Sequence, residues 1–236
     1  MKTYLYTMIS VPVYGLLYLF TTFMVCSLIL LSFLRLRKWV KAGIYLWANL
    51  SFLIMGKRLK ITGLEHIDKK KKYVLIANHA SLFDIMAIMA FHPGVSWFGH
   101  ERLTKIPVFN RLLKMIDYIP IKKGDIRNTK SIIEQAKQKS GGLTIAIFPE
   151  GTRTLNGTIN PFYKGFVHVL KSGQMELLPV TLNGFYRLKP KNRFFINFGT
   201  KINVVIHKPI DPAEFTAKND QQIISTAKQV IESAYY

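Results

Sequence analysis

The chain has 236 residues, and its 33 Lys and Arg against 13 Asp and Glu give a formal net charge of +20 at pH 7. Such a surplus indicates an anionic partner. Membrane lipids or phosphorylated substrates fit better than nucleic acid, because the sequence contains no known nucleic-acid-binding module. The single cysteine excludes an intramolecular disulfide, and the six histidines lack the spacing of zinc ligands, so we expect no metal site.

A long uncharged segment opens the chain. Residues 3–34 contain no charged side chain, whereas a membrane-spanning helix needs about 20 apolar residues. Pro12 and Gly15 interrupt its early part, which places the start of the expected helix near residue 12. The segment is longer than the apolar core of a secretory signal and shows no small-residue cleavage site. We therefore expect it to remain attached and to enter lipid, which also keeps Cys26 away from water-facing chemistry.

A second apolar stretch, rich in aromatic residues, follows at 39–55 and predicts a helix lying in the membrane interface. Basic side chains lie in and around this stretch: Arg35, Arg37, Lys38, Lys41, Lys57, Arg58, Lys60 and residues 69–72. Their number indicates an anionic membrane surface, and the positive-inside rule keeps the remainder of the chain on the cytoplasmic side. Residues 1–58 are thus predicted to form a two-helix membrane anchor.

The remaining residues, 59–236, alternate between strand-like and helical patterns and have the length of one domain. Patterns typical of strands occur at 73–78, 95–99, 118–121, 143–148, 177–182, 193–198 and 202–206. Patterns typical of helices occur at 81–92, 105–115, 128–140, 164–172 and 219–233. This alternation predicts an α/β fold with a mixed, largely parallel sheet and covering helices, preceded by the membrane-associated two-helix segment.

One turn between a predicted strand and a predicted helix carries a candidate base. Residues 78–84 have the sequence NHASLFD, which places His79 directly after the strand and Asp84 in the first helical turn, with Ser81 as a candidate N-cap. Imidazole is the side chain whose unperturbed pKa suits general-base work near neutral pH. Asp84 can accept the Nδ1–H of His79 and leave Nε2 free, as in a catalytic triad, although no serine nucleophile is required here.

A candidate anion site follows another predicted strand. Residues 148–154 have the sequence FPEGTRT, and a Gly-Thr-Arg turn can direct backbone N–H groups and a guanidinium toward one anion. Taken alone, each motif is also compatible with an ordinary structural turn. Both motifs follow the carboxyl ends of predicted strands, where open α/β sheets bind their ligands, and this favours one shared site.

The two motifs resemble the first and third sequence blocks of the glycerolipid acyltransferases, and specifically of the bacterial 1-acylglycerol-3-phosphate acyltransferases. Residues 118–124 are similar to the second block and residues 177–181 to the fourth, so four blocks occur in family order between about residues 73 and 185. The resemblance implies that His79 is the general base and that Asp84 orients it. It also implies that the substrate is bound by Lys123, Glu150, Gly151, Thr152 and Arg153.

Two positions depart from the family pattern. Lys123 stands where the second block usually ends in Arg, and Thr154 stands where the third commonly ends in Ser. Lysine carries the same charge without the bidentate fork, so the geometry of phosphate binding is affected. Threonine keeps the hydroxyl.

The resemblance implies transfer of a fatty acyl chain from a thioester to the sn-2 hydroxyl of 1-acylglycerol-3-phosphate, giving phosphatidate in phospholipid biosynthesis. The thioester co-substrate is acyl carrier protein or coenzyme A, and no further cofactor is expected. The expected location is the bacterial inner membrane, with the catalytic domain of residues 59–236 on the cytoplasmic side. Two alternatives stay open: an acceptor that is another lysophospholipid or a lyso-aminolipid, and a non-catalytic basic membrane-binding protein.

Overall fold

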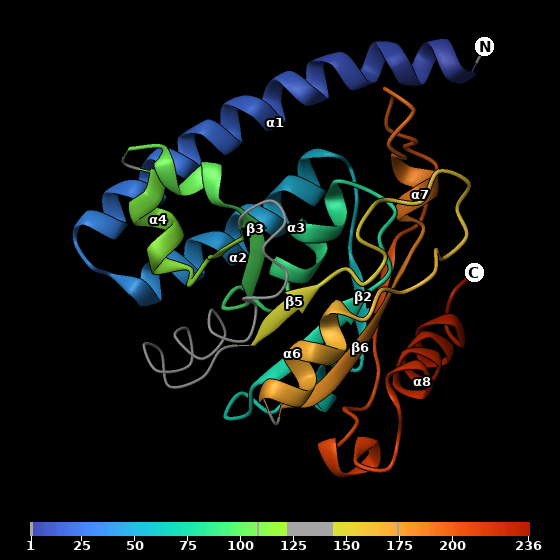
Figure 1. Cartoon of the computed structure of the whole chain (residues 1–236). Coiled ribbons are helices and arrows are strands. Elements are labelled where there is room, and N and C mark those ends of the chain that lie inside the picture. Colours follow the sequence, from blue (N-terminus) through green and yellow to red (C-terminus); the bar gives the residue numbers. More distant parts are fainter. Residues whose placement is uncertain (1, 108, 122–143, 174) are drawn as a thin grey trace.

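Figure 1 shows a twisted sheet with helices on both faces and one long helix, α1, lying across the molecule. The computed structural model describes every residue except 1, 108, 122–143 and 174. The strands are β1 (Lys60–Thr62), β2 (Tyr73–Ala77), β3 (Ser96–His100), β4 (Ile119–Ile121), β5 (Ile145–Ile147), β6 (Glu176–Asn183) and β7 (Asn203–Ile206). Within the described residues these form a seven-stranded sheet in the order β1-β7-β6-β2-β5-β3-β4.

The sheet is mostly parallel. β6 and β7 are antiparallel, whereas the other five neighbouring pairs are parallel. All five residues of β2 are buried, because helices cover a parallel sheet on both faces and the strand between them has no solvent side. The predicted α/β fold with a mixed, largely parallel sheet is therefore confirmed.

Side chains of β2 alternate between two hydrophobic cores, as the period of an extended strand requires. Leu75 and Ala77 pack on the face covered by α2 (Arg37–Ile54) and α3 (Phe83–Met89), whereas Val74 and Ile76 pack on the face covered by α6 (Gly165–Gly173) and α8 (Asp220–Glu232). The remaining short elements are α4 (Phe109–Met115), α7 (Phe185–Leu188) and the 3-10 turns η1 (Leu64–His66), η2 (Glu101–Lys105) and η4 (Pro212–Phe215).

Four predicted helices correspond to α3, α4, α6 and α8, whereas the helix expected at 128–140 lies outside the described residues. The strand expected at 193–198 is wrong, since this segment is irregular. Its alternating pattern arises because Ile196 is buried in the core while Phe194 faces outward beside α1. The sequence analysis also missed β1, a three-residue edge strand whose Lys60 and Thr62 are exposed and give no apolar run.

Helix α1 (Lys2–Phe33) begins ten residues earlier than expected and continues through Pro12. An interior proline removes one backbone hydrogen bond. Contacts with segment 193–198 offset this loss: the Ser10 hydroxyl accepts the Ile196 N–H at 2.8 Å, and the Tyr14 hydroxyl donates to the Phe194 carbonyl at 2.6 Å. Of the helices in the described parts of the chain, α1 is the one long and apolar enough to cross a membrane.

Helix α2 packs on the core through residues spaced four apart, Val40, Ile44, Ala48 and Phe52, and Phe52 meets the Phe185 ring edge-on. Just beyond its end, the buried ammonium of Lys57 donates to the carbonyls of Phe198 and Thr200 at 2.6 and 2.7 Å. Burial lowers the pKa of Lys57. The ammonium thus ties the end of the N-terminal helices to the irregular segment after α7.

Replacing Lys57 with Met should lower the free energy of unfolding by about 2 kcal/mol, because two partly buried carbonyls would lose a charged donor. In a chain of this size, this corresponds to a fall in Tm of about 4–8 °C. Thermal unfolding in detergent measures the change. Arg58→Met is the matched control, because the neighbouring Arg58 is exposed. Equal Tm values for the two variants would contradict a structural role for Lys57.

Candidate active site

The candidate base lies at the carboxyl end of the sheet. His79 follows β2, and Glu150 follows β5, the adjacent parallel strand whose Ile147 pairs with Ile76. Parallel neighbours end at the same edge of a sheet, so the two loops leave it side by side. The predicted juxtaposition of the two motifs is present in the structure.

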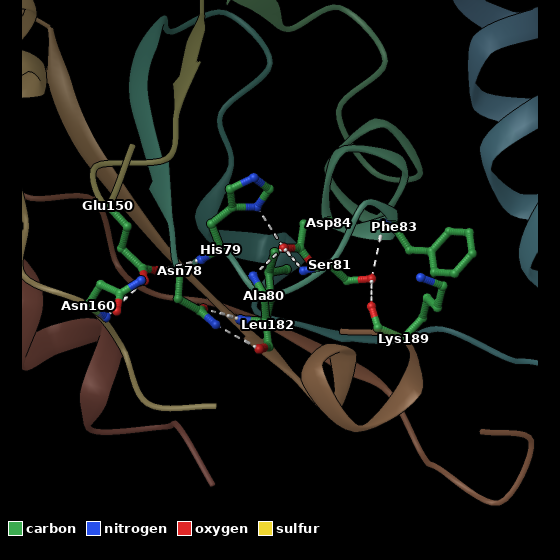
Figure 2. A network of polar contacts seen from close by, with 10 residues as sticks. All are labelled: Asn78, His79, Ala80, Ser81, Phe83, Asp84, Glu150, Asn160, Leu182 and Lys189. Carbon is green, nitrogen blue, oxygen red and sulfur yellow. Dashed lines mark hydrogen bonds and ion pairs between the residues drawn. The ribbon is translucent and has the colours of Figure 1, made fainter. Parts of the chain in front are cut away.

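Asp84 accepts hydrogen bonds from three donors with one oxygen atom (Figure 2). Its Oδ2 lies 2.8 Å from Nδ1 of His79, 2.6 Å from the Ala80 nitrogen and 2.8 Å from the Ser81 nitrogen. A carboxylate can only accept here, so Nδ1 of His79 carries the proton. Nε2 is then the basic nitrogen, and it has no hydrogen-bond partner among the described residues.

The carboxylate of Asp84 is completely buried. Burial raises the pKa of Asp84, while the bonds from His79, Ser81 and Ala80 lower it. Its second oxygen, Oδ1, is buried without a hydrogen-bond partner in the described part of the chain. A charge that is this poorly solvated attracts a neighbouring cation strongly, so Asp84 can stabilise an imidazolium formed on His79.

An aromatic ring holds the face of the imidazole. The rings of His79 and Phe148 are stacked, with centroids 4.0 Å apart and planes at 12°. Trp97 stacks on the same phenyl ring at 5.4 Å. Phe148 restricts rotation of the imidazole, while Asp84 fixes one edge of it. Phe148 is the first residue of the FPEGTRT motif, but the sequence analysis assigned it no role.

The loop after β5 also holds the backbone of His79. Oε1 of Glu150 accepts the His79 N–H at 2.6 Å, and the Thr154 N–H donates to the His79 carbonyl at 2.9 Å. Oε2 of Glu150 accepts the Asn160 N–H at 2.8 Å. Both carboxylate oxygens of this buried residue are therefore engaged by backbone groups. Burial raises the pKa of Glu150, and the two N–H donors oppose this rise.

A role of Glu150 in binding the acceptor substrate stays a prediction. In the structure its carboxylate faces protein backbone and holds the loop that carries His79. A second anion placed beside this carboxylate would be repelled.

Two further polar side chains join the catalytic turn to the rest of the fold (Figure 2). The buried side-chain amide of Asn78 donates to the Leu182 carbonyl at 3.0 Å and accepts the Leu182 N–H at 2.8 Å. These two bonds continue the link between β2 and β6 beyond the last residue of β2. The N-cap position of α3 is Leu82, one residue after the expected Ser81. The Ser81 hydroxyl accepts the N–H of Phe83, the first residue of α3, at 3.4 Å and donates to the Lys189 carbonyl at 2.7 Å. These long-range partners could not be identified from the motif itself.

Residues 151–153 form the outward part of the FPEGTRT loop, whereas Pro149 and Thr154 are buried. Gly151 has φ +65°, a left-handed conformation that favours glycine, and both it and Thr152 are exposed. Arg153 is partly exposed and makes no ion pair with any described residue. Lys189, which the sequence analysis missed, lies close enough for Arg153 to help lower its pKa, after the larger effect of burial. Lys123 lies outside the described residues.

Comparisons with known proteins agree with this geometry. The family model described as Acyltransferase matches residues 58–183. A chloroplastic 1-acyl-sn-glycerol-3-phosphate acyltransferase from Brassica napus, BAT2, is 29% identical over 168 residues, covering 70% of this chain and 48% of the relative. The chain thus spans about half the length of this plant relative. A 1-acyl-sn-glycerol-3-phosphate acyltransferase from Borreliella burgdorferi is 28% identical, covering 85% of this chain and 78% of the relative.

The fold also matches a solved structure. The crystal structure of the 1-acyl-sn-glycerophosphate (LPA) acyltransferase PlsC from Thermotoga maritima superposes with a TM-score of 0.82 at 26% identity, covering 99% of this chain and 97% of that one. The region matched by the family model includes both the His79–Asp84 pair and the FPEGTRT loop, and it exceeds half of the 236 residues. The chain therefore belongs to the acyltransferase family.

Proposed function

We propose that this protein transfers a fatty acyl chain from a thioester to the sn-2 hydroxyl of 1-acylglycerol-3-phosphate, giving phosphatidate. The observation that carries the proposal is the 2.8 Å bond between His79 Nδ1 and buried Asp84, which leaves Nε2 free beside a loop that presents Arg153. The base can take a proton from a substrate hydroxyl, and the unpaired cation can bind a phosphate on the same substrate. The acyl donor is an acyl carrier protein or coenzyme A thioester.

The reaction needs one proton acceptor and no covalent enzyme intermediate. Nε2 of His79 takes the proton of the acceptor hydroxyl as that oxygen attacks the thioester carbonyl. Asp84 stabilises the imidazolium that results. The tetrahedral intermediate then collapses, the carbon–sulfur bond breaks, and the departing thiolate takes the proton from the imidazolium. The products are phosphatidate and a free thiol, and His79 returns to its starting state.

We assign the acceptor phosphate to the outward part of the FPEGTRT loop, where the backbone at Gly151 and Thr152 and the guanidinium of Arg153 are accessible. Lys123 is a second candidate ligand on sequence grounds. Glu150 contributes by fixing the backbone of His79, not by touching the anion.

Membrane association supports the choice of a lipid acceptor. Helix α1 exposes large apolar side chains, including Met8, Tyr18, Leu19 and Phe23, over much of its length. An exposed apolar surface of this extent indicates contact with lipid or another apolar partner. We assign residues 1–58 to anchoring the protein in an anionic membrane, with residues 59–236 forming the acyltransferase domain on the cytoplasmic side of the bacterial inner membrane.

Replacing His79 with Ala should lower kcat by about 100-fold to 10,000-fold, because the general base is lost. Asp84→Asn should fall nearly as far, since its amide would favour the wrong imidazole tautomer. Formation of phosphatidate from 1-acylglycerol-3-phosphate (lysophosphatidate) is measured by mass spectrometry. His168→Ala is the control, because His168 is exposed on α6. A His79→Ala enzyme with activity within about threefold of wild type would refute the assignment.

Glu150→Gln should lower kcat by about 10-fold or more, because one backbone N–H that its carboxylate binds loses its acceptor. The KM for lysophosphatidate should stay nearly constant.

Arg153→Ala should instead raise the KM for lysophosphatidate by about 10-fold through lost phosphate binding. Steady-state kinetics with varied acceptor separate the two effects. A Glu150→Gln enzyme that changes only the acceptor KM would restore a direct binding role.

Lys123→Ala should raise the KM for lysophosphatidate by about 10-fold, because a phosphate contact is lost. A 10-fold rise in KM corresponds to about 1.4 kcal/mol of lost binding free energy. The KM for the thioester should stay nearly unchanged. Lys123→Arg should keep most activity, since the charge remains. Lys122→Ala is the adjacent control and should be milder. Equal effects at the two lysines would place the phosphate elsewhere.

A further inference from the structure

The end of α1 lies beside α4 (Figure 1), and residues from both helices and from the turn after α1 line a basic cavity. It has a volume of about 650 Å³, and four cationic side chains line it: Arg35, Arg37, Arg111 and Lys114. None of these residues belongs to the loops that carry His79 or the FPEGTRT sequence. The cavity therefore requires an explanation separate from the transfer reaction.

Carboxylates neutralise only part of this charge. Asp117 forms an ion pair with Arg37. Within the described ranges of the chain, neither Arg35 nor Lys114 forms an ion pair with a carboxylate. Cations gathered around one cavity repel each other, and an anion bound among them relieves the repulsion.

Arg111 is held in place by the end of the apolar helix. Its Nε donates to the Ser32 carbonyl at 3.2 Å, its Nη2 lies 3.4 Å from the Phe33 carbonyl, and its guanidinium stacks over the Phe33 ring at 4.5 Å from the centroid. These carbonyls belong to the last turn of α1, where the helix dipole is negative and favours a cation. The cavity therefore has one preorganised cation at the end of α1.

The backbone at the cavity is locally unfavourable. Arg35 has φ +57° and Asp117 has φ +54°, and these two are the non-glycine residues with positive φ in the described structure. Glycine adopts this conformation at less cost than a residue with a Cβ atom. The turn after α1 nevertheless carries arginine, and that arginine lines the cavity.

Exposed apolar side chains are adjacent in sequence to the cationic residues of the cavity. Phe33 lines the cavity, and Leu34, Leu36 and Trp39 are exposed in and just after the turn between α1 and α2. A phospholipid presents the same combination, an anionic phosphate directly attached to apolar chains. We propose that this cavity binds the headgroup phosphate of an anionic membrane phospholipid that is not consumed, with its chains beside the apolar surface of α1. The site goes beyond the proposed transfer reaction and rests on the association of α1 with lipid.

The test uses the full chain purified in detergent and titrated with phosphatidylglycerol or phosphatidylcholine, with bound lipid counted by native mass spectrometry. Wild-type protein should retain one phosphatidylglycerol saturably and no phosphatidylcholine. Arg35→Gln combined with Lys114→Gln should raise the apparent Kd by about 10-fold or more. Lys38→Gln combined with Lys105→Gln removes the same charge outside the cavity and should leave the Kd within about twofold. Arg153→Ala should retain the lipid, which excludes the active site as its location.

Equal weakening in the two double variants would overturn the proposal, because diffuse attraction would then explain the binding. Displacement of the lipid by inorganic phosphate at the same concentration would also overturn it, since the site would then recognise a soluble anion. Acyl transfer to lysophosphatidate is measured on the same samples and should be unchanged in both double variants. A wild-type protein that retains phosphatidylglycerol but transfers no acyl chain would refute the proposed function and support the lipid site.

Discussion

The carboxylate of Asp84 is the constraint on which the turn that carries His79 depends. One buried oxygen receives the imidazole Nδ1–H of His79 and the backbone N–H groups of Ala80 and Ser81. The same atom therefore stabilises the shape of the turn and selects the tautomer of His79. Because the carboxylate has no access to water, these donors cannot be replaced by solvent without opening the core. Fold stability and base orientation are therefore linked at this residue.

The second constraint is the contact between the loops that follow β2 and β5. Phe148 covers the imidazole, while Glu150 and Thr154 bind the backbone N–H and carbonyl of His79. The same short loop exposes Gly151 and Arg153 to solvent. A single turn thus has an inward part that holds the base and an outward part suited to an anion. An anion bound at the outward part, as proposed, would be close to His79 without lying beside the buried carboxylates.

The charge of +20 does not have one cause. Lys57 is buried and holds two carbonyls, so its contribution is structural. Arg153 and Lys189 lie near the candidate active site, and repulsion between them is consistent with an anionic substrate. Arg35 and Lys114 line a separate cavity at the end of the apolar helix. Net charge alone indicated an anionic partner, whereas the positions of these side chains distinguish three roles.

The sequence by itself determined the α/β class, most elements and the pairing of His79 with Asp84, because strand and helix periodicity and a five-residue spacing are local properties. It failed at Pro12 and at segment 193–198, and it did not identify the backbone partners of Glu150. In each case the deciding partner is distant in the chain, as with Glu150, which lies 71 residues from His79. Only the tertiary structure decided that this carboxylate binds the backbone of the His79 loop, because parallel neighbouring strands bring the two loops together.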